Sequence, residues 1–451
     1  MLQKAGIKKL GNQKEIFSNR CWTGNTLQPA TVCFAEGKIT AIHFIRTEGA
    51  EDLGDSILMP GVIDAHVHIN EPGRTDWEGF DKATLSAAAG GITTIVDMPL
   101  NASPVTTTVN ALNEKRAASK HKLHVNCGFY GGSIPGNARE LEGLIKAGVM
   151  GIKCFLAPSG IDEFPLVTER DLEAAMPLLA KYAVPLLVHC ELVSACGDLL
   201  HSAPTSYAAY LASRPMKWEN DAIALMIRLC RKFNCPVHIV HVSSAEALGM
   251  IAMAKKEGLP LTAETCAHYI YFNAEDIPDA QCIYKCAPPI RDAANNLLLK
   301  GALKNGVLDF ITTDHSPAPP EIKEIGSGNL LKAWGGIAGL QFLLPASWAG
   351  LKGLIPLQKF IPLLTEYPAK FTGTGNYKGK IAIGYDADLV VWDPEEKWIV
   401  RAEDILFRHK ISPYIGQTLA GVVRQTIVHG IVVFRNHEIV QRNAGREEGR
   451  G

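Results

Sequence analysis

The pattern of apolar and polar positions divides the chain into two β-rich ends and a long middle section of different character. Near the start, ATVCF (30–34) and ITAIHF (39–44) are short β-branched and aromatic runs on either side of a glycine-containing turn, which predicts two strands. Near the other end lie DADLVVWDP (386–394) and a second pair of such runs within 422–436, with glycine between them. We expect the two ends to pair into one small sheet domain.

In the middle section, short apolar runs alternate with segments of roughly ten to twenty residues whose apolar positions follow helical spacing. The segment TERDLEAAMPLLAKYA (168–183) is one of these, with Thr168 as its expected N-cap. The apolar runs number eight: VIDAHV (62–67), ITTIVD (92–97), LHVNCGF (123–129), GVMGIKCF (148–155), PLLVHC (185–190), PVHIVHV (236–242), PLTAET (260–265) and DFITTD (309–314).

Eight alternating units of this kind favour an α/β fold built on a (β/α)8 TIM-type barrel. The alternative is a doubly wound sheet, but no glycine-rich phosphate loop follows the first strand. We therefore expect a barrel domain over residues 62–375 and a small β-sandwich domain formed jointly by residues 1–61 and 376–451.

Composition and charge exclude several classes of protein. The chain has 45 Lys and Arg residues against 46 Asp and Glu, so it has no basic footprint for nucleic acid or an anionic membrane. No apolar run is long enough to span a bilayer, and the opening MLQKAGIKKLGNQ lacks the apolar core of a signal peptide. The odd number of cysteines, eleven, predicts reduced thiols. We expect a cytoplasmic protein.

Reactive side chains gather where the predicted strands end. In a barrel the carboxyl ends of all strands face one mouth, which is where active sites form. His66 and His68 lie two residues apart at the end of the first run, so strand alternation directs both side chains to the same face. The later runs contribute Lys153, His189, His241 and Asp314. We expect these side chains to meet at the barrel mouth.

Each of these residues has an ordinary structural explanation when it is taken alone. A histidine at a strand end is usually a hydrogen-bonded polar residue, and an aspartate before His-Ser-Pro often forms a turn. A buried lysine is harder to explain this way, because an unpaired ammonium must deprotonate or find a partner. We expect His238 and His268 to lie outside the ligand set, and Cys154 and Cys190 to be small core residues.

The sequence resembles the amidohydrolase superfamily, and within it the cyclic amidohydrolases: dihydroorotases, hydantoinases (dihydropyrimidinases) and allantoinases. The similarity runs in order along most of the chain. The matching motifs are PGVIDAHVHINEPGR (60–74), VDMPLNASP (96–104), GIKCFLAPSG (151–160), LLVHCE (186–191), HIVHVSS (238–244), ETCAHY (264–269), KCAPPIRD (285–292), TTDHSP (312–317) and GKIAIGYDADLVVWDP (379–394).

The resemblance implies two divalent metal ions held by the six residues at the strand ends. Lys153 would be an N6-carboxylysine, formed from CO₂, whose carbamate bridges both ions. His66, His68 and Asp314 would complete one site, and His189 with His241 the other. Zinc is the expected metal on imidazole and oxygen ligands, with cobalt, manganese or iron as alternatives. A hydroxide bridging the metals would attack a cyclic amide, and Asp314 would carry its proton to the leaving nitrogen.

Two positions distinguish the subgroups of this family. Dihydroorotases carry an arginine two residues past the second histidine, where it pairs with the substrate carboxylate, and here that position is Asn70. Hydantoinases carry a tyrosine five residues past the bridging lysine, and here that position is Pro158. What remains, in 68–80 and 153–165, is similar to allantoinases, which open the ring of allantoin to give allantoate.

This similarity implies a neutral, ureido-rich substrate. Asn70 would suit it, because an amide side chain offers both donors and acceptors; Asn101 and backbone groups around Ala287 would be further contacts. Hydantoinase-type and dihydroorotase activities are the alternatives, followed by a non-catalytic oligomeric scaffold. The scaffold reading requires a replaced metal ligand, whereas all six positions are filled. The resemblance also implies a homotetramer.

Overall fold

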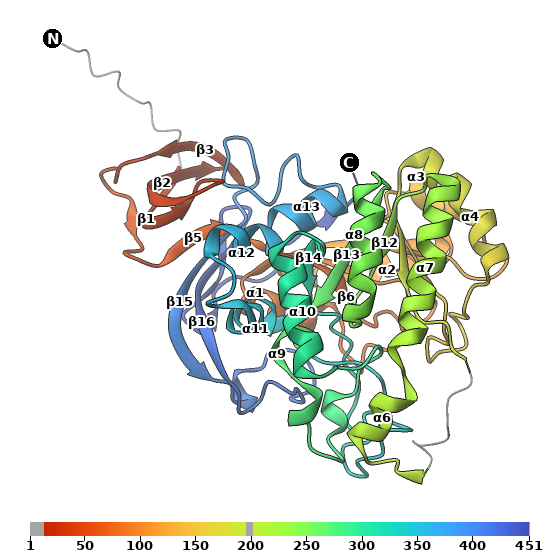
Figure 1. Ribbon diagram of the computed structural model, residues 1–451. Helices are drawn as coiled ribbons and strands as arrows, with labels where there is room; N and C mark the ends of the chain where they lie inside the picture. Colours follow the sequence, from red (N-terminus) through yellow and green to blue (C-terminus); the bar gives the residue numbers. More distant parts are fainter. Residues whose placement is uncertain (1–12, 195–201, 451) are drawn as a thin grey trace.

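The computed structural model describes residues 13–194 and 202–450 (Figure 1). The opening segment 1–12, which covers nearly all of the stretch considered as a signal peptide, lies outside the described residues. Within the described residues, the chain forms one large mixed sheet and two groups of parallel strands that are flanked by helices.

The large sheet joins the two ends of the chain, as the sequence predicted. Its nine strands include the order β18-β17-β16-β15-β5-β1-β2-β3, and β4 pairs with β1. The early strands lie beside the late ones in Figure 1 because β5 pairs antiparallel with β15. The bounds are β1 Lys14–Trp22, β2 Leu27–Ala35, β3 Lys38–His43, β4 Glu51–Asp52, β5 Ile57–Pro60, β15 Leu389–Ile399, β16 Thr418–Val428, β17 Ile431–Arg435 and β18 Glu438–Ile439.

The hairpin between β16 and β17 turns through two left-handed residues. His429 and Gly430 have φ values of 48° and 74°. Two such residues match the right-handed twist of the flanking strands, which is why glycine is favoured at this kind of tip. The glycine in the sequence therefore located the turn correctly.

The parallel strands form a six-stranded sheet, β14-β13-β12-β11-β10-β9, and a four-stranded sheet, β19-β8-β7-β6. Every one of the eight predicted runs contains a strand. The bounds are β6 Val62–Val67, β7 Ile92–Asp97, β8 Asn126–Phe129, β9 Gly131–Gly132, β10 Ile152–Phe155, β11 Leu186–His189, β12 Val237–Ile239, β13 Leu261–Cys266, β14 Phe310–Thr312 and β19 Glu447–Glu448. The ladders do not form one closed ring, although a single parallel bridge joins Val67, at the end of β6, to His315, just beyond β14.

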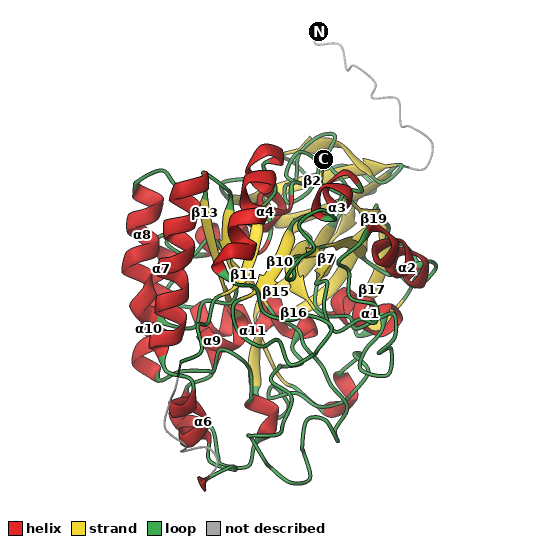
Figure 2. Cartoon of the chain, turned by 90° about the vertical axis from the view of Figure 1, so that its right-hand side faces the viewer, coloured by secondary structure: helices red, strands yellow, loops and turns green. Residues whose placement is uncertain are grey.

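Helices follow the parallel strands and cover their outer side (Figure 2). Helix α4 is an example: its buried residues, Leu172, Ala175, Met176 and Leu179, lie on one face, and that apolar face packs inward. Thr168 caps its start, as predicted, and also forms a capping box with Asp171. The bounds are α1 Phe80–Ala89, α2 Val109–Ser119, α3 Leu141–Lys146, α4 Glu169–Tyr182, α6 Tyr207–Ser213, α7 Met216–Phe233, α8 Leu248–Lys256, α9 Ala267–Tyr271, α10 Ala293–Lys304, α11 Leu343–Leu351, α12 Leu357–Leu364 and α13 Glu366–Thr372.

Within residues 13–194 and 202–450, the buried hydrophobic residues form one large cluster and two smaller ones. Cys154 and Cys190 belong to the large cluster, as expected for small core residues. All ten cysteines in the described part of the chain are free and buried. In the same part, no helix is long and apolar enough to cross a membrane.

Candidate active site

A cavity of about 310 Å³ opens where the parallel strands end, and its wall contains every residue that the sequence predicted as a metal ligand. Lys153 lies within β10 and His189 is the last residue of β11. His241 and Asp314 each come two residues after a strand has ended. Residues from five strands that are far apart in sequence therefore meet at one place, as the barrel hypothesis requires.

His66, His68 and Asp314 form one compact group. The Nε2 atoms of both histidines lie 3.2 Å from Oδ1 of Asp314, and one ligand atom from each residue lies within 4.8 Å of the others. All three residues are buried. Two imidazoles and a carboxylate that converge in this way are a suitable donor set for a divalent cation.

His189 and His241 form a second group beside the first. Nδ1 of His189 lies 3.0 Å from Nε2 of His241, and the rings of His66 and His241 are 5.5 Å apart between centroids. Lys153 is fully buried, and its Nζ atom has no hydrogen-bond partner among the residues that the structure describes. An ammonium in that position would be unfavourable, so the amine fits a neutral or chemically modified form.

The backbone is left-handed at four of the predicted site residues. The φ values are 67° at Asn70, 70° at Asn101, 39° at His241 and 46° at Asp314. Residues other than glycine seldom adopt this conformation, and where they do the site is often functional. Here each left-handed residue lies two to four residues past the end of a parallel strand: β6, β7, β12 or β14.

Two buried carboxylates fix the orientation of two of the histidines. Oε1 of Glu264, on β13, lies 2.5 Å from Nδ1 of His66, and Oε2 of Glu191 lies 2.8 Å from Nε2 of His189. An ionised carboxylate can only accept, so each of these ring nitrogens carries a hydrogen. That leaves Nε2 of His66 and Nδ1 of His189, which face the site, as the potential metal-binding atoms.

The charges of the site follow from burial and from these contacts. Burial lowers the pKa of His68 to about 4 and that of Lys153 to about 8. Burial also opposes charge on His66, yet Asp314 and Glu264 together raise its pKa to about 9. Burial alone would raise the pKa of Asp314, but contact with His66 and His68 holds it well below its usual range. The site thus concentrates negative charge that a cation can balance.

The residues present fit two divalent metals. The first group supplies two imidazoles and a carboxylate, the second supplies two imidazoles, and the amine of Lys153 lines the same cavity. Asp314 and Glu264 raise the pKa of His66 and so favour positive charge at this point, which a bound cation could supply instead.

A second group of acidic residues with a histidine does not form a metal site. Asp386, Asp388 and His429 also lie close enough to share an ion. However, Nζ of Lys378 lies 2.8 Å from Asp386 and 2.7 Å from Asp388. The lysine ammonium already supplies the positive charge, so this cluster is a buried salt bridge rather than a metal site.

The predicted substrate contacts differ in position. Asn101 and Ala287 line the cavity, and Nδ2 of Asn101 lies 3.4 Å from Nδ1 of His68. Asn70 does not line it: its side chain is fully buried, with Nδ2 3.4 Å from the carbonyl of Pro317. Its contact with substrate stays a prediction. Pro158, at the hydantoinase tyrosine position, is part of the wall.

His238 and His268 lie outside both ligand groups, as expected, but His238 is not isolated from the site. Its Nε2 atom lies 3.1 Å from Oε2 of Glu264, the same carboxylate that holds His66. Strand alternation explains this arrangement, since residues 238 and 264 lie on neighbouring strands β12 and β13. His238 therefore supports the predicted ligand His66 through the shared carboxylate of Glu264.

Sequence reasoning missed several residues around the cavity. Glu191 and Glu264 lie inside the motifs LLVHCE and ETCAHY. Their position, as acidic residues within or just after a buried strand, is the signal that could have identified them. Arg214, Lys285 and Trp334 also line the wall. Arg214 lies between α6 and α7, and Trp334 lies in an irregular segment, where no strand-end signal applies.

Comparison with known proteins gives a consistent result. Residues 57–433 match the model of the Amidohydrolase family. The chain is 43% identical to an allantoinase of Streptomyces avermitilis, covering 94% of this chain and 96% of that protein. It is 44% identical to an allantoinase of Arabidopsis thaliana, covering 85% and 79% respectively. Among solved structures, L-hydantoinase (dihydropyrimidinase) from Arthrobacter aurescens superposes with a TM-score of 0.89 at 31% identity, covering 96% of this chain and 99% of that one.

Proposed function

Because this chain belongs to the amidohydrolase family, we propose that it is an enzyme that hydrolyses the cyclic amide bond of allantoin to give allantoate. One observation carries the proposal: the histidines, lysine and aspartate of a hydrolytic metal site converge on one cavity, in a chain more than 40% identical to allantoinases from a bacterium and a plant.

The family and its hydantoinase neighbours imply a binuclear metal centre. His66, His68 and Asp314 would hold one ion and His189 with His241 the other, and Lys153, as a carbamate, would be a ligand of both. Zinc is the expected metal. When bound, two such cations would polarise a carbonyl and lower the pKa of water to about 7. The buried, unpartnered amine of Lys153 supports the carbamate, because only a neutral amine takes up CO₂.

Asp314 is the proposed proton carrier. Its carboxylate stays ionised because contact with His66 and His68 holds its pKa low, so it can accept the proton that water releases as the new C–O bond forms. It then donates that proton to the ring nitrogen as the C–N bond breaks. Because the amide is cyclic, the new carboxylate and the released nitrogen remain in one ring-opened product.

The proposed substrate contacts follow the cavity wall. Asn101 and the backbone around Ala287 would hold the ring beside the ligand groups, since both line the cavity. Asn70 would act on the substrate indirectly. Its amide lies 3.4 Å from the Pro317 carbonyl, and the neighbouring Ser316 lines the wall.

Hydantoin is a second candidate substrate. The hydantoinase neighbour superposes over nearly its whole length, so the scaffold suits a plain hydantoin ring as well. Pro158 stands where hydantoinases carry tyrosine, and the allantoinases are the more similar sequences. We therefore place allantoin first.

The fold and assembly complete the proposal. We propose that the eight parallel units are a (β/α)8 barrel over residues 62–375, and that residues 1–61 and 376–451 form a composite β-sandwich domain. The paired ends of the large sheet support this division. By family resemblance we also propose a homotetramer acting on a small-molecule substrate.

The test is metal-dependent turnover of allantoin. Purified protein should contain close to two divalent ions per chain and release allantoate. Chelation should abolish the activity, and zinc with bicarbonate should restore it. A protein that binds no divalent metal, or that is fully active after complete chelation, would contradict the proposed mechanism.

A further inference from the structure

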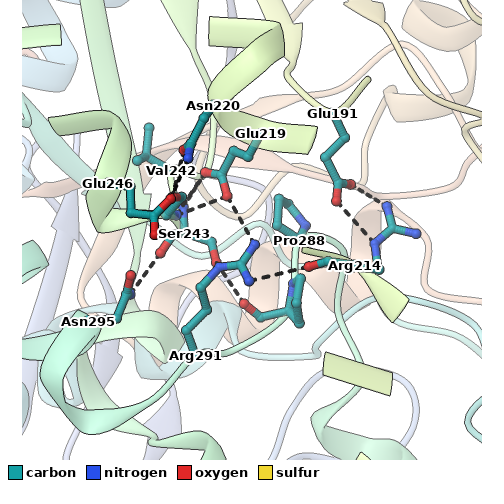
Figure 3. Close-up of polar contacts among 12 residues, drawn as sticks. Glu191, Arg214, Glu219, Asn220, Val242, Ser243, Glu246, Pro288, Arg291 and Asn295 are labelled. Carbon is teal, nitrogen blue, oxygen red and sulfur yellow. Dashed lines mark hydrogen bonds and ion pairs between the residues drawn. The ribbon is translucent and has the colours of Figure 1, made fainter. Parts of the chain in front are cut away.

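Arg214 places a guanidinium in the wall of the cavity, outside the predicted ligand set. It lies between α6 and α7, and its side chain is 23% exposed. Nε lies 3.1 Å from Oε1 of Glu191, and Nη2 contacts Oε2 of the same carboxylate (Figure 3). This two-point pairing fixes the plane of the guanidinium, because both partners are planar and fork-shaped.

The pairing uses only part of the guanidinium. Nη1 of Arg214 has no hydrogen-bond partner among residues 13–194 and 202–450. An arginine carries five N–H groups, so donors on Nη1 are left for another molecule. Since Arg214 lines the cavity, a molecule in the cavity is the nearest candidate acceptor.

The backbone of Arg214 also has a partner. Nη1 of Arg291 donates to the carbonyl oxygen of Arg214 at 3.3 Å, and Nε of Arg291 donates to Oγ of Ser243 at 3.1 Å. Glu219 accepts from the backbone N–H of Ser243 at 2.7 Å and lies 3.5 Å from Nη2 of Arg291. Figure 3 shows this brace beside the Arg214–Glu191 pair. Arg214 is therefore fixed before any substrate arrives.

The guanidinium also lies close to the reacting centre. Oε2 of Glu191 accepts from Nε2 of His189, a proposed metal ligand, at 2.8 Å, and the same carboxylate holds Arg214. A single carboxylate thus separates Arg214 from the ligand set. In allantoin the ureido group is attached to the ring carbon next to the carbonyl that is cleaved, so its own carbonyl oxygen is a near neighbour of the reacting carbon.

The other cations near the cavity are less suited to this position. Nζ of Lys285 donates to the carbonyl of Ala333 at 2.5 Å. Lys332 also lines the cavity but is exposed. Arg74 donates to the carbonyl of Asn101 at 2.9 Å and pairs with Glu163, and it does not line the wall.

We propose that Arg214 is a specificity-determining residue, and that Nη1 donates a hydrogen bond to the ureido carbonyl of the substrate. This inference rests on the proposed function. A charged, fixed donor favours substrates that carry the acceptor, and a ring without the ureido group gains nothing from it. The contact therefore discriminates allantoin from hydantoin.

The test compares the two substrates in the same variants. In zinc-loaded Arg214→Met and Arg214→Lys protein, matched for metal content, kcat/KM for allantoin should fall about 10- to 100-fold more than kcat/KM for hydantoin. Where hydantoin turns over too slowly, its inhibition constant against allantoin replaces kcat/KM and should change less than twofold. Lysine keeps the positive charge but lacks the forked N–H groups. If one of the two variants fails to fold, the other still tests the contact.

A second variant and a control separate binding from positioning. Glu191→Gln breaks the pair that fixes Arg214 as well as the contact with His189, so both substrates should lose activity and allantoin should lose more. Arg228→Met breaks a similar two-point pair with Glu169 on the exposed face of α7 and should change neither value. An unchanged allantoin-to-hydantoin ratio in active Arg214 variants would overturn this inference alone. A wild-type protein that leaves allantoin intact would overturn the proposed function, and this inference with it.

Discussion

Nδ1 of His66 lies 2.5 Å from Oε1 of Glu264, and both side chains are fully buried. Oε2 of the same carboxylate lies 3.1 Å from Nε2 of His238, whose other ring nitrogen lies 2.8 Å from the Thr262 hydroxyl. The orientation of a proposed metal ligand is thus set by a chain of hydrogen bonds that runs back along the parallel strands β12 and β13.

Glu264→Gln should weaken metal binding. The amide keeps the size of the side chain, but it has lost the charge that orients and polarises His66. We expect metal affinity to fall about 10- to 100-fold, measured by competition with a chromophoric chelator, and the visible spectrum of the cobalt-loaded protein to change. Glu448→Gln, in the Lys378 salt bridge away from the cavity, is the control. Equal metal affinity and an unaltered cobalt spectrum in the Glu264 variant would refute this role.

Lys153→Ala should lose both metal and activity, with turnover reduced by more than about 100-fold. Lys153→Arg should fail as well, because a guanidinium stays protonated and cannot form a carbamate. Short carboxylic acids added with zinc should partly restore the alanine variant but not the arginine variant. Near-normal turnover in either variant without such rescue would remove the bridging carbamate from the account.

Reconstitution of the metal-free protein should depend on pH through Lys153. Burial lowers the pKa of this amine from 10.5 to about 8, and a group with a lowered pKa gains its neutral form as pH rises through that value. At constant dissolved CO₂ with zinc, the rate of reactivation should rise between pH 7 and pH 8 and level off near pH 9. A rate that keeps rising tenfold per pH unit through pH 9 would indicate an ordinary lysine instead.

Asp314→Asn should lower kcat far more than it changes KM, because the carboxylate transfers a proton in the chemical step and is not a proposed substrate contact. A loss of about 10²- to 10⁴-fold in kcat is expected for a general acid–base group. Metal content must be measured in the same samples, since the change also removes a proposed ligand. Full metal occupancy with unchanged kcat would mean that the proton moves by another route.

The sequence was most informative where chemistry coincided with regular strands. His66, Lys153 and His189 could be placed because buried strands have a strict period of two and end at a common edge. Glu191 and Glu264 were overlooked because their role depends on which ring nitrogen they face, which no spacing reveals. Arg214 reaches the cavity from a helix junction, and its brace through Arg291 joins segments more than seventy residues apart.

Asn70 illustrates a different limit. Its position two residues past His68 predicts a contact with substrate, and that contact stays a prediction, because its left-handed backbone and its position beside the Pro317 carbonyl leave it outside the cavity lining. A left-handed residue after a strand redirects the chain, so the period-two rule no longer gives the side-chain direction.

The cations of the wall bear directly on substrate choice. A dihydroorotate carboxylate needs a fixed cation that is not already paired. Arg214, the guanidinium of the wall, is already offset by the charge of Glu191. Among the described lining residues outside the proposed ligand set, a carboxylate would otherwise meet only the lysines Lys285 and Lys332, which lack the two-point geometry, whereas uncharged allantoin needs no counter-charge.

The central claim is tested most directly by the kcat/KM values of the zinc-loaded protein for allantoin, hydantoin, dihydrouracil and dihydroorotate, measured under one set of conditions. We predict the highest value for allantoin, exceeding that for dihydroorotate by a factor on the order of 10⁴, with hydantoin well below allantoin. A higher value for dihydroorotate or hydantoin would contradict allantoin as the substrate, while leaving the binuclear amidohydrolase site to be judged by its metal content.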